Sequence, residues 1–337
     1  MQIRRRYRYG RGLGLLAGFI AMLIGMLASA TLGAVQVPFD QAIASFLAYD
    51  IDNMGHVIVR TTRVPRALYG AAVGASLAAA GAVMQAMTRN PLASPSIMGI
   101  NAGAATFVVA AITIFSMTSL PMLLAASFTG AAVSGSLVFL LSIAGREKLS
   151  SMKIIMAGSA VTALFASLTQ GMLVHDEAGL NDVLYWLTGS IAGRPQDALL
   201  RVLPFMAAGW LAAVLLARHL NIMEFGDQAA QGLGQRTAAI KLLGGLLVIV
   251  LAGAAVAIAG PIGFIGIIVP HIVRSLVGRD YRWLIPYNLV FGALLLLLAD
   301  LAARFIIMPE ELPVGVMTAA IGVPYFVYIA RRGWGQG

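Results

Sequence analysis

The chain has 337 residues, of which 59% are hydrophobic and 11% are charged, and its formal net charge is +9. Soluble domains carry about 25% charged residues, so this composition excludes an ordinary soluble protein and indicates a polytopic membrane protein. The absence of cysteine excludes disulfides, iron–sulfur clusters and thiolate zinc sites. In a membrane protein, an excess of Lys and Arg marks cytoplasmic loops rather than a surface for nucleic acid.

Breaks rich in charge, Pro or Gly divide the chain into about ten apolar segments of near-spanning length. The first follows a basic start, as in a signal peptide, but it is long enough to span a bilayer and we expect it to be retained. The segments beginning at 94 and 262 are short or broken by proline, which a membrane protein tolerates where protein surrounds them. In chain order, the segments are 13–34, 66–88, 94–114, 119–143, 152–174, 200–218, 242–260, 262–277, 284–303 and 314–330.

The basic residues predict the orientation of the chain. If the first span starts inside the cell and the spans alternate, most of the 23 Lys and Arg fall on the cytoplasmic side. We therefore expect both termini to be cytoplasmic. The basic residues left on the outer side are Arg60, Arg63, Arg66, Arg194, Arg201 and Arg304.

Three of these arginines precede a long apolar run in the stretch VRTTRVPRALYGAAVGASLAAAG. Pro65 suits a first helical position, which predicts that the helix begins near it. Arg60, Arg63 and Arg66 then lie at the positive end of a helix dipole and on the unfavourable side of the membrane. Such a site favours an acidic partner. The alternative is lipid anchoring, in which arginines extend to headgroup phosphates.

A long polar loop on the inner side, at about 219–241, lies in the stretch RHLNIMEFGDQAAQGLGQRTAAIK, which runs from Arg218 to Lys241. We expect two short amphipathic helices, separated by Gly232, Leu233 and Gly234. Loops longer than about 12–15 residues are usually functional, so this loop is predicted to bind a partner. The alternative is a solvated connector.

The apolar segments contain few chemically active groups. Asp300 is the only carboxylate clearly inside an apolar run, and an intramembrane acid is a candidate proton or ion site. However, Arg304 follows four residues later, so we expect the two to pair along one helix face. A lone His271 is expected to bond a neighbouring carbonyl rather than a metal. Gly70, Gly74 and Ala78 are predicted to pack against another helix.

Prolines and glycines mark the structural breaks. Gly260 and Pro261 predict a sharp helix reversal, while Pro91 and Pro270 interrupt or end helical segments. No HExxH, GxSxG or phosphate-loop motif occurs, so we predict that the chain is not an enzyme. If ATP drives its function, another polypeptide must bind the nucleotide.

Three stretches carry a resemblance to a known family. They are RVPRALYGAAVGASLAAAGAVMQAMTRNPLASPSIMGINAGA, AIAGPIGFIGIIVPHIVRSLVGRD and LLLLLADLAARFIIMPEELPVGVMTAAIGVPYFVYIARR. In order and over nearly the whole chain, they resemble the iron-siderophore, haem and cobalamin permeases of bacterial ABC importers, the FecCD type.

The resemblance implies an all-α permease in a bacterial cytoplasmic membrane, with residues 1–337 forming one domain of about ten transmembrane helices. It further implies a second permease subunit, identical or paralogous, two ATP-binding subunits, and a periplasmic or lipid-anchored binding protein. ATP and magnesium would bind to the ATPase, so no cofactor is expected in this chain. Its partners would be these proteins and membrane lipid, not nucleic acid.

The resemblance also implies roles for particular residues. Docking of the binding protein would fall to Arg63, Arg66, Arg304 and, more weakly, Arg60. Coupling to the ATPase would fall to Glu224, Gly232, Leu233, Gly234, Gln235 and Arg236. The translocation pathway would run between the subunits, along the stretches that contain Ser159, Thr162, Ser167 and Thr318.

The expected cargo is a ferric siderophore, with the ferric citrate type included. Haem, cobalamin or an oxyanion are the alternatives within the family. An ion-coupled secondary carrier is a second class of function, but it predicts several intramembrane carboxylates and an inverted repeat, which the sequence does not display. A structural or sensory membrane protein is a third.

Overall fold

The computed structural model describes residues 2–33, 35–117, 119–143, 151–175, 186–194, 196–308 and 310–333. Within these ranges the chain is helical and contains no strand, which confirms the predicted all-α class. Seven described helices are long and apolar enough to cross a membrane, and three shorter apolar helices accompany them. Together they correspond one by one to the predicted apolar segments.

The helices extend beyond the apolar runs that predicted them, because their polar ends continue the same helix. The long helices are α1 (Gln2–Thr31), α4 (Val64–Thr88), α6 (Leu120–Ile143), α7 (Ser151–His175), α9 (Gln196–Met223), α11 (Thr237–Ala259) and α13 (Tyr281–Ile306). The shorter apolar helices are α5 (Ile100–Thr113), α12 (Ile265–Val277) and α14 (Val314–Gly333). Small helices outside them are α2 (Phe39–Leu47), α3 (Met54–Ile58) and α10 (Asp227–Gly232).

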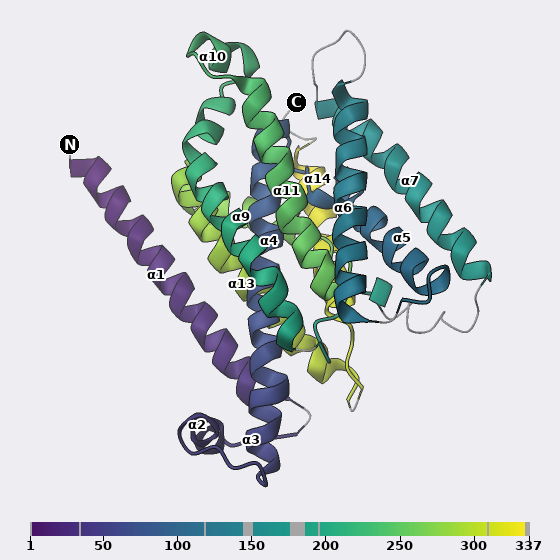
Figure 1. Ribbon diagram of the computed structural model, residues 1–337. Helices are drawn as coiled ribbons and strands as arrows, with labels where there is room; N and C mark the ends of the chain where they lie inside the picture. Colours follow the sequence, from purple (N-terminus) through teal and green to yellow (C-terminus); the bar gives the residue numbers. More distant parts are fainter. Residues whose placement is uncertain are drawn as a thin grey trace.

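Helix α4 is the centre of the bundle and packs against α9, α11, α12 and α13 (Figure 1). Glycines allow these close contacts. A Cβ added at Gly74 would lie 2.2 Å from the carbonyl oxygen of Gly292, and one at Gly81 would lie 2.1 Å from that of Gly266. Lipid supplies no hydrophobic drive between helices, so such backbone approach contributes much of the association. The predicted packing role of the Gly74 ridge is confirmed.

Helix α4 begins at Val64, next to Pro65 as predicted, but the chain before it is also helical. A single helical rod runs from Met54 to Thr88 and includes a π-helical turn at Val59–Arg63. Proline inside an α-helix lacks an N–H and crowds the carbonyl four residues earlier. The wider π turn directly before Pro65 accommodates both effects. The chain is therefore helical on the N-terminal side of Pro65 as well, where the sequence alone predicts no helix.

The bundle has two distinct ends, which we call the α10 end and the α2–α3 end (Figure 1). Helix α1 crosses the bundle obliquely at one edge, and α7 lies at the opposite edge. At the α10 end, the Arg11 carbonyl of α1 accepts a hydrogen bond from Tyr287 of α13, and Ile329 of α14 shares a cavity with Glu224. The N-terminal part of α1 and the C-terminal part of α14 therefore lie at the same end of the bundle. An even number of spans requires this arrangement.

Two non-helical segments, around Ser190 and around Gly260, lie together inside the bundle near the break between α11 and α12. The Ser190 N–H donates to the carbonyl of Ala259 at 2.8 Å, which satisfies part of the exposed backbone. Gly260 has φ +71°, and a Cβ there would lie 2.5 Å from the carbonyl oxygen of Trp186. The predicted reversal at Gly260 and Pro261 is confirmed, since α11 runs away from the α10 end and α12 returns to it.

Candidate functional site

Two arginines hold the C-terminal end of α1 at the α2–α3 end of the bundle. The Arg63 guanidinium donates to the Thr31 carbonyl at 2.5 Å. The Arg304 guanidinium donates to the carbonyls of Ser29 and Leu32 at 2.8 and 3.0 Å. The last carbonyls of a helix have no partner within the helix, and cations there also complement the helix dipole. These arginines therefore supply hydrogen-bond donors to the C-terminal carbonyls of α1 at a buried position.

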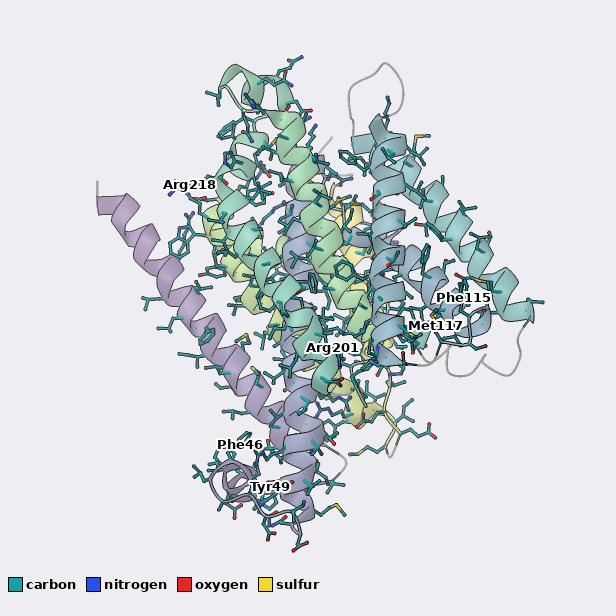
Figure 2. All side chains as sticks on the ribbon, in the orientation of Figure 1. Phe46, Tyr49, Phe115, Met117, Arg201 and Arg218 are labelled. Atoms are coloured by element: carbon teal, nitrogen blue, oxygen red, sulfur yellow. The ribbon has the colours of Figure 1, made fainter. Side chains whose placement is uncertain are left out.

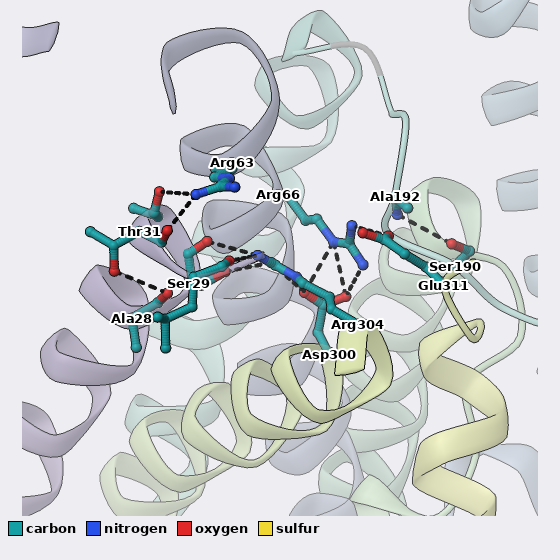
Figure 3. Close-up of polar contacts among 12 residues, drawn as sticks. Ala28, Ser29, Thr31, Arg63, Arg66, Ser190, Ala192, Asp300, Arg304 and Glu311 are labelled. Carbon is teal, nitrogen blue, oxygen red and sulfur yellow. Dashed lines mark hydrogen bonds and ion pairs between the residues drawn. The ribbon is translucent and has the colours of Figure 1, made fainter. Parts of the chain in front are cut away.

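Asp300 lies between two arginines in the same region (Figure 3). Arg66 donates to both of its carboxylate oxygens, with the shortest contact at 2.8 Å, and Arg304 donates to Oδ2 at 2.7 Å. Asp300 is 1% exposed and Arg304 is 2% exposed. The predicted pairing of Asp300 with Arg304 is confirmed. This engagement with two cations favours a structural role over a proton or ion site.

Glu311 completes the cluster and was not predicted. Its Oε2 accepts from Arg66 at 2.5 Å, and it lies just before α14. The cluster of Arg63, Arg66, Asp300, Arg304 and Glu311, which we call the outer ion cluster, therefore joins α1, α4, α13 and the approach to α14. No sequence pattern pointed to Glu311, because its loop is separated from Arg66 by most of the chain.

This geometry corrects the expected position of the docking arginines. Arg63, Arg66 and Arg304 were placed on an accessible rim, but all three are buried and bonded to groups of this chain. Their charges are balanced internally by carboxylates and helix-end carbonyls. Arg60 alone of the four is exposed, with its guanidinium carbon 4.6 Å from the ring centre of Tyr49. A docking role stays a prediction, and it fits the accessible Arg60 better than the other three.

The α10 end carries the predicted coupling loop. One short helix, α10, replaces the two that were expected, and Gly232, Leu233 and Gly234 form its end and the following turn. Gly234 has φ +80°, which suits glycine at that turn. Leu233 is 70% exposed and Phe225 is 75% exposed, so the loop presents two large apolar side chains to its surroundings.

The loop is fixed at its base. Lys241 at the start of α11 donates to Asp227 of α10 at 2.6 Å. The side chain of Gln235 donates to the carbonyl of His219 at 3.1 Å, and Arg236 is exposed at the N-terminus of α11. The predicted coupling residues therefore lie together on one surface of the molecule, except that Glu224 turns inward.

A hydrogen-bonded network connects Glu224 to the α12–α13 corner. Tyr281 donates to Glu224 Oε1 at 2.9 Å and accepts from Arg274 at 2.9 Å. Asn221 accepts from the Tyr281 backbone N–H at 2.8 Å and donates to Asp280 at 2.8 Å. These bonds join the last turn of α9 to α12 and α13. Sequence reasoning missed Asn221 and Tyr281, because their roles depend on contacts across about 60 residues of chain.

Asp280 is the N-cap of α13 and accepts the backbone N–H of Arg282. Burial on its own would raise the pKa of this carboxyl. Hydrogen bonds from the Arg282 side chain and from Asn221 together have the larger, opposite effect, so the pKa lies below its ordinary value. The carboxylate is therefore held in its charged form, in which it accepts bonds from both elements.

The predicted pathway residues are not brought together within one chain. Ser159 and Ser167 are exposed on α7, Thr162 is half-buried, and Thr318 is buried in α14. Helix α7 packs on α5 and α6, whereas α14 packs on α12 and α13.

Of the two predicted proline breaks, Pro91 lies between helices, whereas α12 continues through Pro270, so the prediction is wrong for Pro270. Pro91 follows α4 in a turn where Asn90 accepts the N–H of Leu92, and Pro270 lies inside α12. His271, beside it, makes an edge contact with Tyr325. Within the described ranges, no three His, Asp or Glu side chains come close enough to hold a metal ion.

Comparisons with known proteins agree with this architecture. The model of the FecCD transport family matches residues 21–332. The chain is 50% identical over 312 residues to the probable siderophore transport system permease protein YfiZ of Bacillus subtilis (strain 168), covering 93% of both chains. It is 42% identical over 314 residues to the Fe(3+)-citrate import system permease protein YfmD of the same organism, again covering 93% of both.

A solved structure shows the same fold. It is described as an inward-facing conformation of a putative metal-chelate type ABC transporter, and it superposes with a TM-score of 0.83 at 29% identity, covering 94% of this chain and 98% of that one. The family match spans almost all of the helical bundle, including the outer ion cluster and the coupling loop. The chain therefore belongs to the FecCD transport family and is a multi-pass membrane permease.

Proposed function

We propose that this chain is the permease subunit of a binding-protein-dependent ABC importer that carries a ferric siderophore across the bacterial cytoplasmic membrane. The observation that carries this proposal is the family match over residues 21–332, together with 50% identity to a siderophore permease. The ferric citrate relative is less similar, at 42% identity, so ferric citrate is the second candidate cargo. Haem, cobalamin and an oxyanion remain the alternatives to be tested.

The surfaces of the chain support three kinds of partner. The exposed Phe225 and Leu233 at the α10 end suit an apolar groove on one of the two ATP-binding subunits. The exposed face of α7, which carries Ser159 and Ser167, suits a second permease subunit across the translocation pathway. Arg60 at the other end suits carboxylates of a substrate-binding protein. In this arrangement both chain termini are cytoplasmic.

The geometry also suggests how ATP-driven motion reaches the bundle. The salt bridge between Asp227 and Lys241 ties α10 to α11, and the contacts of Glu224 and Asn221 with Tyr281 tie the end of α9 to α13. A displacement of α10 by the ATPase is then transmitted to three spanning helices rather than absorbed by a flexible loop. Such a rigid-body shift produces alternating access between outward-open and inward-open states.

Cargo uptake tests the proposal. Cells that depend on this permease for iron are supplied with iron-55 as a ferric siderophore, as ferric citrate or as haem, and accumulated iron is counted with and without the chain. The proposal predicts accumulation of the siderophore. Uptake of haem alone would contradict the siderophore assignment, and uptake of none would contradict import.

Coupling is tested by a matched pair of substitutions. Leu233→Asp places a charge on the exposed coupling turn, and Ile51→Asp makes the same kind of change at the opposite end, where Ile51 is 73% exposed. We expect Leu233→Asp to lose the ATPase subunits on co-purification in detergent and Ile51→Asp to retain them. Equal retention by both variants would refute the assigned docking surface.

A further inference from the structure

A cavity of about 880 Å³ opens at the α10 end, between the end of α4, helix α12 and the end of α14. Protein sites for small molecules typically measure about 300–1,000 Å³, so this cavity has room for a ligand much larger than an inorganic ion. The residues that define its chemistry are Gln85, Arg89, Glu224, Arg274 and Arg279.

Most of the charged side chains in the cavity lining are cationic, namely Arg89, Arg274 and Arg279 against Glu224. Arg274 donates to Tyr281, which in turn donates to Glu224, so the only carboxylate among the described lining residues is already engaged. Among the described residues, neither Arg89 nor Arg279 forms a salt bridge. Two guanidinium groups beside a concave, partly apolar wall attract anions more strongly than they would on a flat surface.

Gln85 supplies a second, independent sign of a ligand. This residue is 1% exposed, and its Nε2 donates to the carbonyl of Gly266 at 3.1 Å. Its Oε1 is buried and has no hydrogen-bond partner among the described residues. Buried polar atoms are nearly always paired, so an unpaired amide oxygen in a cavity lining indicates a donor supplied from outside the chain.

The cavity also adjoins the coupling loop. Arg89 adopts a left-handed conformation at the end of α4 with φ +50°, and a Cβ added at Gly226 would lie 3.0 Å from its Nη1. Glu224 and Arg274 belong both to the cavity lining and to the network with Tyr281. A ligand in the cavity therefore lies next to the elements that the proposed ATPase contact would move.

We propose that this cavity is a release site for an anionic ferric chelate, in which Arg89 and Arg279 bind its carboxylates or phenolates and Gln85 accepts a hydrogen bond from its hydroxyl, amide or iron-bound water. This inference rests on the proposed import function and specifies the charge class of its cargo. Movement of the coupling loop disturbs the cavity lining and lowers the affinity.

The test uses the full chain with its partner subunits in nanodiscs of phosphatidylcholine, without ATP, and equilibrium dialysis against iron-55 ferric citrate as the anionic probe. We expect saturable binding to the wild type. The double variant Arg89→Gln and Arg279→Gln should bind roughly tenfold or more weakly, because it loses two charge-assisted contacts. Arg218→Gln is the control, since Arg218 is exposed at the same end of the bundle but outside the cavity lining (Figure 2).

Each other outcome is decisive. Equal affinity of the wild type and the double variant would overturn the proposal, as would the absence of binding to the wild type. Competition by inorganic phosphate at equal concentration would reduce the cavity to a general anion site and also overturn it. A ferric trihydroxamate without negative charge should bind the wild type and the double variant alike.

Uptake assays separate this inference from the proposed function. If wild-type cells import the iron chelate but the double variant binds ferric citrate normally, only the release site is wrong. If the wild type imports no chelate at all, the proposed function itself fails. Gln85→Met provides a further check, because it removes the unpaired amide oxygen with similar volume and is expected to weaken chelate binding without preventing assembly.

Discussion

Replacing Asp300 by Asn should destabilise the permease more than any other single change of charge in the outer ion cluster. The carboxylate is 1% exposed and accepts bonds from two guanidinium groups, with shortest distances of 2.8 Å from Arg66 and 2.7 Å from Arg304. Asn has the same shape but no charge, so it leaves two buried cations facing a neutral amide. Hydrogen bonds to charged groups contribute about 1.5–3 kcal/mol each, and breaking a buried ion pair costs about 3–5 kcal/mol.

The assay is reversible unfolding of the purified permease in mixed micelles of dodecyl maltoside and sodium dodecyl sulfate. We expect Asp300→Asn to lower the free energy of unfolding by about 3–5 kcal/mol. Asp197→Asn is the control, because its pair with Arg201 is exposed at 56% and 57% and should contribute no more than about 1 kcal/mol. A loss of less than about 1 kcal/mol for Asp300→Asn would show that the cluster does not stabilise the junction of α1, α4 and α13.

Two further predictions concern packing and pH. Gly81→Ala should lower the free energy of unfolding by about 1–3 kcal/mol, because the new Cβ would lie 2.1 Å from the Gly266 carbonyl. Gly171→Ala, whose new Cβ would have no atom of the described residues within 4 Å, should be neutral or slightly stabilising in the same titration. The lowered pKa of Asp280 adds stability that is present above the ordinary Asp pKa and is lost as the pH falls through the folded-state pKa. The difference in unfolding free energy between wild type and Asp280→Asn should therefore shrink between about pH 5 and pH 2. A difference independent of pH would contradict the assigned bonds with Arg282 and Asn221.

The spanning helices could be predicted because hydrophobic runs of fixed length report directly on burial in lipid. The ends of these helices could not be predicted, since polar residues such as those at the start of α9 can extend a helix beyond its apolar run. The π turn before Pro65 is a further example. Considered from the sequence alone, Pro65 indicates a helix start. The tertiary contacts of Arg63 with the end of α1 keep the chain helical both before and after Pro65.

The outer arginines show a second limit of sequence reasoning. Their unfavourable position correctly indicated a need for compensating charge, and the nearby Asp300–Arg304 pair was predicted from helical spacing. Glu311 and the carbonyls of α1 are distant in sequence, so the sequence offered no way to choose between partners inside and outside the chain. The structure provides internal partners for Arg63, Arg66 and Arg304 and leaves Arg60 accessible.

The most direct test of the central claim is uptake of an iron-55 ferric siderophore into proteoliposomes that contain the permease pair with its ATPase subunits, with loaded binding protein supplied on the outer side and ATP on the ATPase side. The account predicts uptake that requires both ATP and the binding protein, and that stops when ATP is replaced by a non-hydrolysable analogue. Uptake driven by a proton or sodium gradient without ATPase subunits would contradict it, and would indicate an ion-coupled carrier instead.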